Sequence, residues 1–236
     1  MTDRLTILGS GTTNLVPERA AASALIQYRQ LRLVFDFGRG VSLRLVEHGL
    51  KQDDVEHAFI SHFHPDHITD LLPYLHAASR SQIDRRTKDL NLYGPPGLTD
   101  VINRLFRVFG WSHELSRNFT VHVHEVTTGD ITIGSEHLTV FDLGHSYGLR
   151  AGHMAVAGDA DVDDRLVRCL SGAQLAVLDA GHPSDEQIID LAVATQVPTL
   201  VCSHQYRPLD GPALQAAAAQ RGYTGHIIVA HDLQTV

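Results

Sequence analysis

The segment Ser61–His67 constrains this chain most, because three histidines and one aspartate fall within six consecutive positions. His62 and His64 lie two residues apart, so in extended backbone at the end of a strand both imidazoles face the same side. Asp66 and His67 follow a proline that turns the chain, and we expect them to open a helix and address a second point nearby. This spacing predicts a centre of two metal ions, which lie about 3.5–4 Å apart in such sites.

Chance is the alternative explanation, because the chain contains 16 histidines. A purification tag would be a terminal run of one residue type, whereas this cluster is internal and mixed. Imidazole and carboxylate together are typical of sites for zinc and other borderline metals. We therefore interpret the segment as a metal site.

Length and composition fit one large α/β domain over residues 1–236 as well as two small ones. The chain is 43% hydrophobic, which is enough for a full core, and because no linker forces two domains we expect a single one. The N-terminus enters a strand-like run without a basic and then apolar leader, and no apolar stretch is long enough to cross a bilayer. Because there are only two cysteines, the sequence predicts a reduced, cytoplasmic protein.

The formal net charge is −8. Contacts to phosphate backbones draw on lysine and arginine, so this charge argues against broad, non-specific binding of nucleic acid.

The first part of the chain is predicted to form strands and loops. Residues 5–8 read as a strand that ends in a Gly-x-Gly turn, which lacks the third glycine and the helix of a dinucleotide site. Residues 23–37 read as a hairpin closing on Asp36. This carboxylate either orients a metal ligand or its loop, or caps a helix predicted over 41–48.

The middle of the chain continues this alternation. We expect a strand over 55–61 that delivers the histidine cluster, followed by one helix from 66 to about 79. The other expected elements are a strand over 90–93, a helix over 98–109, and strands within 119–141 that break at 129–130 and 134–135.

The segment Gly144–Gly148 supports two readings. His145 can be a further metal ligand, or Gly-His-Ser-Tyr-Gly can be the Gly-x-Ser-x-Gly turn of a serine hydrolase with Ser146 as nucleophile. That turn requires a helix directly after the serine. Residues 149–157 instead read as strand, which favours the metal ligand.

The last third of the sequence places polar residues after successive strands. Asp159 follows an apolar strand and could bridge two cations, with a helix predicted over about 162–170. Strands over 175–178, 199–202 and 226–229 are followed by Asp179 and His182, by His204, and by the pair His231 and Asp232. Polar groups at several strand ends indicate a site along one edge of a sheet. By alternation Cys202 could also ligate, although a buried, inert thiol is the usual role of such a residue.

These residues together resemble the metallo-β-lactamase superfamily, and most closely its ribonuclease Z and cyclic phosphodiesterase branch. The family pattern His-x-His-x-Asp-His is intact at 62–67, and Asp36, His145, Asp159 and His204 follow in the expected order. Weaker echoes are residues 8–12, 93–97 and 230–232.

The resemblance implies an α/β fold of four layers, an αβ/βα sandwich in which two mixed β-sheets are flanked by helices. It also implies two divalent metal ions, zinc in the first place, with manganese or iron as alternatives. One ion would be held by His62, His64 and His145, and the other by Asp66, His67 and His204. Asp159 would bridge the two.

Two departures from the family limit what the resemblance implies. Members that process tRNA insert a long arm between the positions of His145 and Asp159, where this chain has only 13 residues. They also carry His-Glu-Ala-Thr where this chain has residues 178–181, Leu-Asp-Ala-Gly, so the helper histidine is absent. His182 is a candidate replacement.

The sequence therefore predicts a dinuclear metal-dependent hydrolase that attacks a phosphodiester with a metal-bridging hydroxide. Asp66 would orient the hydroxide, and His182 would be the general acid. The expected substrate is a small, cyclic or short RNA phosphodiester rather than tRNA, and the sequence leaves a homodimer open.

Three alternatives remain at this stage. A lactonase, thioesterase or β-lactamase would use the same metals on an acyl carbon, because chemistry is set by the pocket rather than by the scaffold. A serine hydrolase would act through Ser146. A non-catalytic RNA-binding relative is disfavoured by the complete ligand set and the negative charge.

Overall fold

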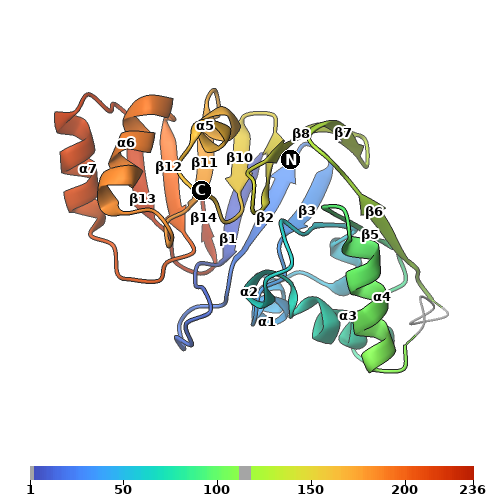
Figure 1. Ribbon diagram of the computed structural model, residues 1–236. Helices are drawn as coiled ribbons and strands as arrows, with labels where there is room; N and C mark the ends of the chain where they lie inside the picture. The colour runs from blue at the N-terminus through green and yellow to red at the C-terminus, as the bar shows by residue number, and fades with distance from the viewer. Residues whose placement is uncertain (1–2, 112–117) are drawn as a thin grey trace.

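The computed structural model describes residues 3–111 and 118–236. They form two seven-stranded β-sheets that pack face to face, and helices cover the outer face of each sheet (Figure 1). This is the four-layer αβ/βα sandwich with mixed sheets that the family resemblance implies.

The first sheet has the strand order β14-β1-β2-β3-β4-β5-β6. Strands β3 to β6 run parallel to one another, and β14, β1, β2 and β3 pair antiparallel. Its strands are β1 (Arg4–Gly9), β2 (Ser23–Tyr28), β3 (Leu31–Phe35), β4 (His57–Phe59), β5 (Leu90–Gly94), β6 (Val121–Glu125) and β14 (Gln234–Thr235).

The second sheet has the order β13-β12-β11-β10-β9-β8-β7. Here β10 to β13 are parallel, and β7 to β10 form an antiparallel meander. Its strands are β7 (Gly129–Ile133), β8 (Glu136–Asp142), β9 (Tyr147–Ala151), β10 (Met154–Ala157), β11 (Leu175–Asp179), β12 (Thr199–Ser203) and β13 (His226–Val229).

The helices divide between the two outer faces (Figure 1). Those of the first sheet are α1 (Val41–Glu47), α2 (Pro65–Ile68), α3 (Leu71–Arg80) and α4 (Leu98–Val108), with a 3₁₀ turn over Gln52–Asp54. Those of the second are α5 (Asp164–Leu170), α6 (Asp185–Thr195) and α7 (Gly211–Gln220). No helix among the described residues is long and apolar enough to cross a membrane.

Successive side chains along each strand point to opposite faces of the sheet, and this alternation places them in two different parts of the core. In β2, Ala24 and Ile26 point between the two sheets, whereas Leu25 points outward beneath the helices. In β11, Val177 points between the sheets and Leu178 points outward. Because both faces of these strands are covered, they read as nearly continuous apolar runs.

Three sequence-based boundaries are wrong. The helix predicted from 66 to 79 is two helices, α2 and α3, because the backbone N–H of Asp70 donates to the carbonyl of Phe37 at 2.9 Å instead of continuing the helical ladder. The strand predicted over 55–61 is shorter, since β4 covers three residues. The break predicted at 129–130 lies inside β7, whereas 134–135 does form a turn.

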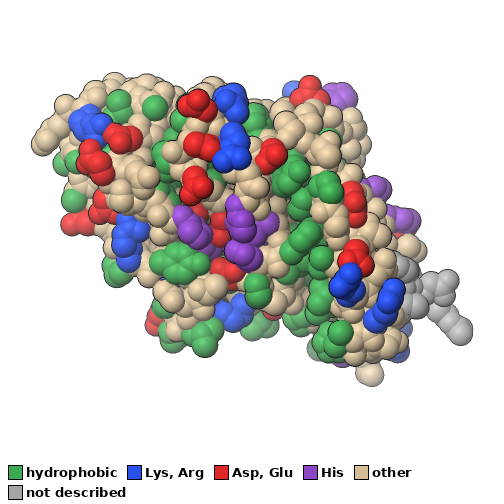
Figure 2. Space-filling model, viewed as in Figure 1, with side chains coloured by type: hydrophobic (Ala, Val, Ile, Leu, Met, Phe, Trp, Pro, Cys, Tyr) green, Lys and Arg blue, Asp and Glu red, His purple; other side chains and the backbone are tan. Residues whose placement is uncertain are grey.

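The candidate site lies where the strand ends of both sheets meet. The loops after β3, β4, β8, β10, β11 and β12 come together there, as expected when parallel strands end at one edge (Figure 1). In the space-filling view, histidine side chains gather in the middle of this face, beside acidic and hydrophobic groups (Figure 2).

Candidate metal centre

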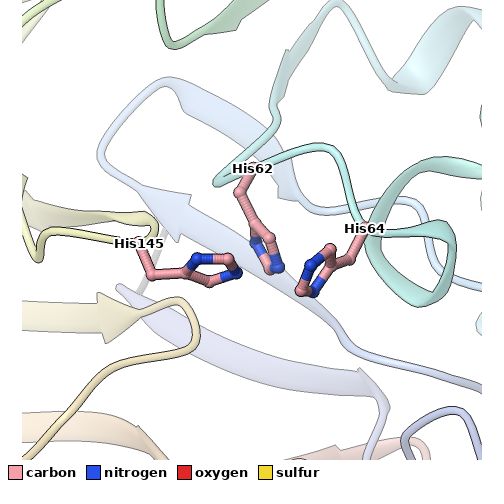
Figure 3. A group of neighbouring side chains, drawn as sticks. All are labelled: His62, His64 and His145. Carbon is pink, nitrogen blue, oxygen red and sulfur yellow. The ribbon is translucent and has the colours of Figure 1, made fainter.

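One group of three histidines lies at the mouth of the site. His62 and His64 come from the loop after β4, and His145 comes from the loop after β8 (Figure 3). Their ring centroids are 4.6 Å apart for His62 and His64, 5.0 Å for His62 and His145, and 4.6 Å for His64 and His145. One nitrogen of each ring lies within 4.8 Å of the others, so the three could hold a metal ion.

A second, buried group lies next to the first. His67 Nε2 is 3.2 Å from His204 Nε2, which in turn is 3.3 Å from Asp66 Oδ2. Asp66 and His67 lie in α2, whose first residue is the proline that turns the chain after His64. These three side chains also form a group that could hold a metal ion.

Asp159 lies between the two groups. Its Oδ2 is 3.7 Å from His62 Nε2, and its Oδ1 is 3.1 Å from His67 Nε2 and 3.6 Å from His204 Nε2. The structure therefore brings together all seven residues that the sequence and the resemblance nominate as ligands, although they span positions 62 to 204.

Asp36 supports this arrangement through contacts with two neighbouring residues. Its backbone has a φ of 63°, in the left-handed region, and its carboxylate turns toward the loop after β4. Oδ1 accepts from the backbone N–H of Ser61 at 2.7 Å, and Oδ2 lies 2.7 Å from His67 Nδ1. The N-cap of α1 is Gly40, so Asp36 does not cap that helix. Of the two interpretations offered by the sequence, the geometry favours the one in which Asp36 orients other residues.

Asp179 has a similar position, although the sequence named it only as one of several polar groups at strand ends. Its Oδ1 lies 3.1 Å from His204 Nδ1, and its Oδ2 lies 2.6 Å from His182 Nδ1. With Asp159, His182 and His204 it forms a further group that could hold a metal ion. The signal in the sequence is a carboxylate at the end of β11, three residues before a histidine.

His182 lies at the entrance of the site. Its side chain is 46% exposed, and its Nδ1 is 4.0 Å from Asp159 Oδ2. A cavity of about 320 Å³ opens here, and its lining includes His145, Asp159 and His182. The hydrogen bond that His182 donates to Asp179 is the main cause of a raised pKa at His182.

Ser146 is not placed as a nucleophile would be. Its side chain is buried and its hydroxyl donates to the backbone carbonyl of Asp159 at 2.7 Å. The chain then continues as β9 rather than as a helix, so the turn that a serine hydrolase requires is missing. Cys202 points into the outer core and burial raises its pKa to about 12, which is the state of an inert thiol.

The protonation states of the centre divide by position. Burial and the neighbouring charge of His67 lower the pKa of His62 to about 3. Burial opposes charge on His204, but hydrogen bonds to Asp179 and Asp66 outweigh it and raise the pKa to about 9. Burial likewise opposes charge on Asp66, yet the hydrogen bond from His204 brings its pKa to about 2. The buried carboxylates therefore stabilise positive charge close to them. Where no cation is bound, protons on neighbouring histidines carry this charge.

Divalent ions fit this set of donors. His62 Nε2 is buried and has no hydrogen-bond partner among the described residues, although it points at Asp159. A buried nitrogen without a partner is costly in a closed protein and ordinary in a metal ligand. Imidazole with carboxylate is also the donor mixture of borderline divalent metals.

A protein-family model described as "Anti-Pycsar protein Apyc1" matches residues 3–174. The chain belongs to this family. In sequence it is 26% identical to ribonuclease Z of Mycobacterium bovis (strain BCG / Pasteur 1173P2), covering 98% of this chain and 97% of the relative. It is 37% identical to ribonuclease Z of Clostridioides difficile (strain 630), over 43% of this chain and 32% of that protein.

Solved structures agree on the fold of this Apyc1 family member. The metallo-β-lactamase fold protein YhfI from Bacillus subtilis superposes with a TM-score of 0.80 at 16% identity, covering 99% of this chain and 98% of YhfI. A diphosphatase of the PhnP family superposes with a TM-score of 0.77 at 20% identity, covering 100% of this chain and 97% of the diphosphatase. The short form of human tRNase Z superposes with a TM-score of 0.75 at 22% identity, covering 99% of this chain and 98% of that protein.

The fold, the ligand clusters and these relatives confirm the predicted superfamily and branch. The chain is a metal-dependent hydrolase of the metallo-β-lactamase superfamily, on its ribonuclease Z and phosphodiesterase branch. The His and Asp clusters could hold divalent metal ions.

Proposed function

We propose that this protein is a dinuclear metal-dependent phosphodiesterase whose substrates are small or cyclic phosphodiesters, or short RNA. The observation that carries the proposal is the position of Asp159, which places one carboxylate oxygen toward His62 and the other toward His67 and His204. A carboxylate shared in this way between two donor groups suits a pair of metal ions.

The family resemblance assigns the residues to the two ions. His62, His64 and His145 would hold one ion, Asp66, His67 and His204 would hold the other, and Asp159 would lie between them. When bound, the ions activate water as the nucleophile and take up charge that develops on the phosphoryl oxygens. Zinc is the first expectation for both positions, with manganese or iron as alternatives.

Two side chains of the protein complete the proposed reaction. Asp66 lies in the buried group and orients the attacking water. His182 lies at the entrance, and Asp179 engages its Nδ1 at 2.6 Å, which leaves Nε2 for the substrate. Nε2 then donates a proton to the leaving alkoxide as the general acid. His182 follows Asp179 by three positions in the chain, and in this proposal it replaces the helper histidine that is absent here.

The expected size of the substrate follows from the segment between His145 and Asp159. In this chain it is filled by the short strands β9 and β10, with two residues between them. Several relatives are ribonuclease Z proteins, but an arm that could hold tRNA has no room in this segment. Acyl substrates such as lactones, thioesters and β-lactams remain the second candidate, because the same metal centre serves both reactions.

One experiment tests the proposal. The purified protein is analysed for metals and assayed against an aryl phosphodiester, an aryl phosphomonoester, a lactone and a cephalosporin analogue, with and without a chelator. We expect two metal ions per chain and chelator-sensitive hydrolysis of the diester. Preferred hydrolysis of the lactone or cephalosporin would reject the phosphodiesterase.

Two variants test the dinuclear mechanism. His64→Ala and Asp66→Ala should lose metal and at least a hundredfold in turnover. His226→Ala is the matched control, because His226 is an exposed histidine in β13. If His64→Ala keeps near-normal activity with one metal lost, the dinuclear mechanism is wrong.

Some expectations stay predictions. They are the single domain over residues 1–236, the cytoplasmic setting and the homodimer. Size measurement in solution at several concentrations tests the last of these.

A further inference from the structure

One aromatic side chain beside the metal centre has no part in the proposed reaction. Tyr206 follows β12 by three residues, and its ring lies edge-to-face against two histidines of the site. The centroid distances are 5.5 Å to His182 and 5.3 Å to His204, with interplanar angles of 80° and 87°. Tyr206 therefore touches both the proposed general acid and a proposed metal ligand.

Neighbouring residues determine the position of the Tyr206 ring. A Cβ atom added to Gly181 would lie 2.5 Å from Tyr206 Cδ2 and 2.3 Å from the carbonyl of His204, so only glycine leaves room for the ring. Asn14 Nδ2 donates to the carbonyl of Tyr206 at 3.1 Å. The backbone N–H of Gln205 donates to the carbonyl of Ser10 at 3.0 Å. These hydrogen bonds anchor the backbone of Gln205 and Tyr206, and the ring itself packs against His182, His204 and the space left by Gly181.

The ring nevertheless remains open to solvent. Tyr206 is 37% exposed, whereas the adjacent His204 is 3% exposed. Leu15 and Val16, in the loop that contacts Tyr206 through Asn14, are 80% and 38% exposed. An aromatic side chain that packs edge-to-face on its neighbours and stays partly exposed beside a polar site is suited to stacking against a planar group of a ligand.

We propose that Tyr206 is a positioning residue that stacks on a planar ring of the substrate, a nucleobase or an aryl group, while the phosphate lies at the metal centre. The inference rests on the proposed phosphodiesterase activity for its biological meaning. It goes beyond that activity by naming the residue that distinguishes a diester carrying a flat ring from one that carries none.

A structural role is the competing explanation. Tyr206 could act only by packing against His182 and His204, in which case its removal would impair every substrate and ligand equally. Stacking instead predicts a loss that appears only with ligands that carry a ring. A pair of ligands that differ only in the ring therefore separates the two explanations.

The first measurement uses fluorescence and does not depend on turnover. The chain has a single tryptophan, Trp111, so Tyr206→Trp combined with Trp111→Phe leaves one indole at the proposed stacking position. Adenosine 5′-monophosphate should quench this indole at saturation, and ribose 5-phosphate, which has the same sugar and phosphate but no base, should not. Equal quenching by both compounds, or by neither, would overturn the inference.

The second measurement uses the native tyrosine as reference. We expect the metal-loaded wild-type protein to bind adenosine 5′-monophosphate about tenfold more tightly than ribose 5-phosphate, in line with the strength of stacking on an aromatic residue. Tyr206→Leu should reduce this ratio to about one, and Tyr206→Phe should keep it. Binding is followed by calorimetry, with the metal content of each variant measured alongside.

The outcomes remain distinguishable from failure of the proposed function. If the ratio changes as expected and no phosphodiester is hydrolysed, the stacking position stands and the phosphodiesterase is wrong. If phosphodiesters are hydrolysed and Tyr206→Leu weakens both compounds equally with full metal content, Tyr206 is only a packing residue.

Discussion

The carboxylate of Asp36 lies 2.7 Å from Nδ1 of His67, although 31 positions separate the two residues in the chain. The oxygen that contacts His67 is Asp36 Oδ2, and it also accepts a hydrogen bond from Ser61 Oγ at 2.8 Å. His67 is thereby turned so that its other nitrogen, Nε2, faces Asp159 at 3.1 Å. A carboxylate behind a histidine in this way sets the tautomer and the ring orientation that a metal ligand needs.

Asp36→Asn should therefore weaken metal binding. We expect a loss of about tenfold to a hundredfold in metal affinity, because the amide holds His67 less firmly and no longer favours its basic form. Competition with a chromogenic chelator measures the affinity. Glu136→Gln is the matched control, since Glu136 is also a buried carboxylate but pairs with Arg29 away from the site. An unchanged affinity in Asp36→Asn would contradict the orienting role.

The position of His182 predicts a dependence on the leaving group. A general acid matters most when the departing oxygen is strongly basic and little when it is a stable phenolate. His182→Gln should lower kcat for a diester with an alkyl leaving group by about a hundredfold to a thousandfold, but by less than about tenfold for 4-nitrophenolate. The measurement is kcat for both substrates in both proteins. Equal losses on the two substrates would assign His182 to binding instead.

Gly38 lies where the loop after β3 presses against α2. A Cβ atom at this position would lie 2.2 Å from the carbonyl oxygen of Asp66 and 2.8 Å from the carbonyl carbon of Ala21, both of them backbone atoms. Gly38→Ala should cost about 1–3 kcal/mol in the free energy of unfolding and displace α2. In Gly211→Ala the added Cβ meets only Cγ2 of Val229 at 3.0 Å, so this control should change stability less. Urea denaturation and metal analysis compare the two.

Asp163 predicts a pH-dependent contribution to stability. It caps α5 by accepting from the backbone N–H groups of Arg165 and Leu166, and the Arg165 side chain is the main cause of its lowered pKa. A carboxylate whose pKa is lower in the folded state stabilises the protein above its unfolded-state pKa of about 3.9, and this stabilisation is lost as the pH falls through the folded-state pKa.

Asp163→Asn keeps a capping side chain and removes the charge. Because the ion pair of Asp163 with Arg165 is on the surface, the variant should lose only about 0.5 kcal/mol in the free energy of unfolding at pH 7. The difference from wild type should shrink toward zero below about pH 3. Denaturation at a series of pH values checks this. A difference that is constant with pH would show that charge plays no part.

Much of the site was predictable because its chemistry is local in the sequence. His62, His64, Asp66 and His67 form one motif, and its spacing indicates a metal site without any knowledge of the fold. Alternating and continuous apolar runs likewise predict most strands, since burial on one or both faces of a sheet sets these patterns. Positions at strand ends made His145, Asp159 and His204 candidates, and the family resemblance then connected these three residues to the motif.

What the sequence by itself determined is the type of chemistry and the class of fold. Only the tertiary structure decided which distant groups support that chemistry: Asp179 between His182 and His204, Tyr206 at the entrance, and Ser146 as a support for Asp159 rather than a nucleophile. The break between α2 and α3 belongs to the same class, because Asp70 is drawn to the carbonyl of Phe37. The physical reason is that hydrogen bonds and ring contacts between loops depend on how the two sheets meet, and spacing along the chain does not encode that.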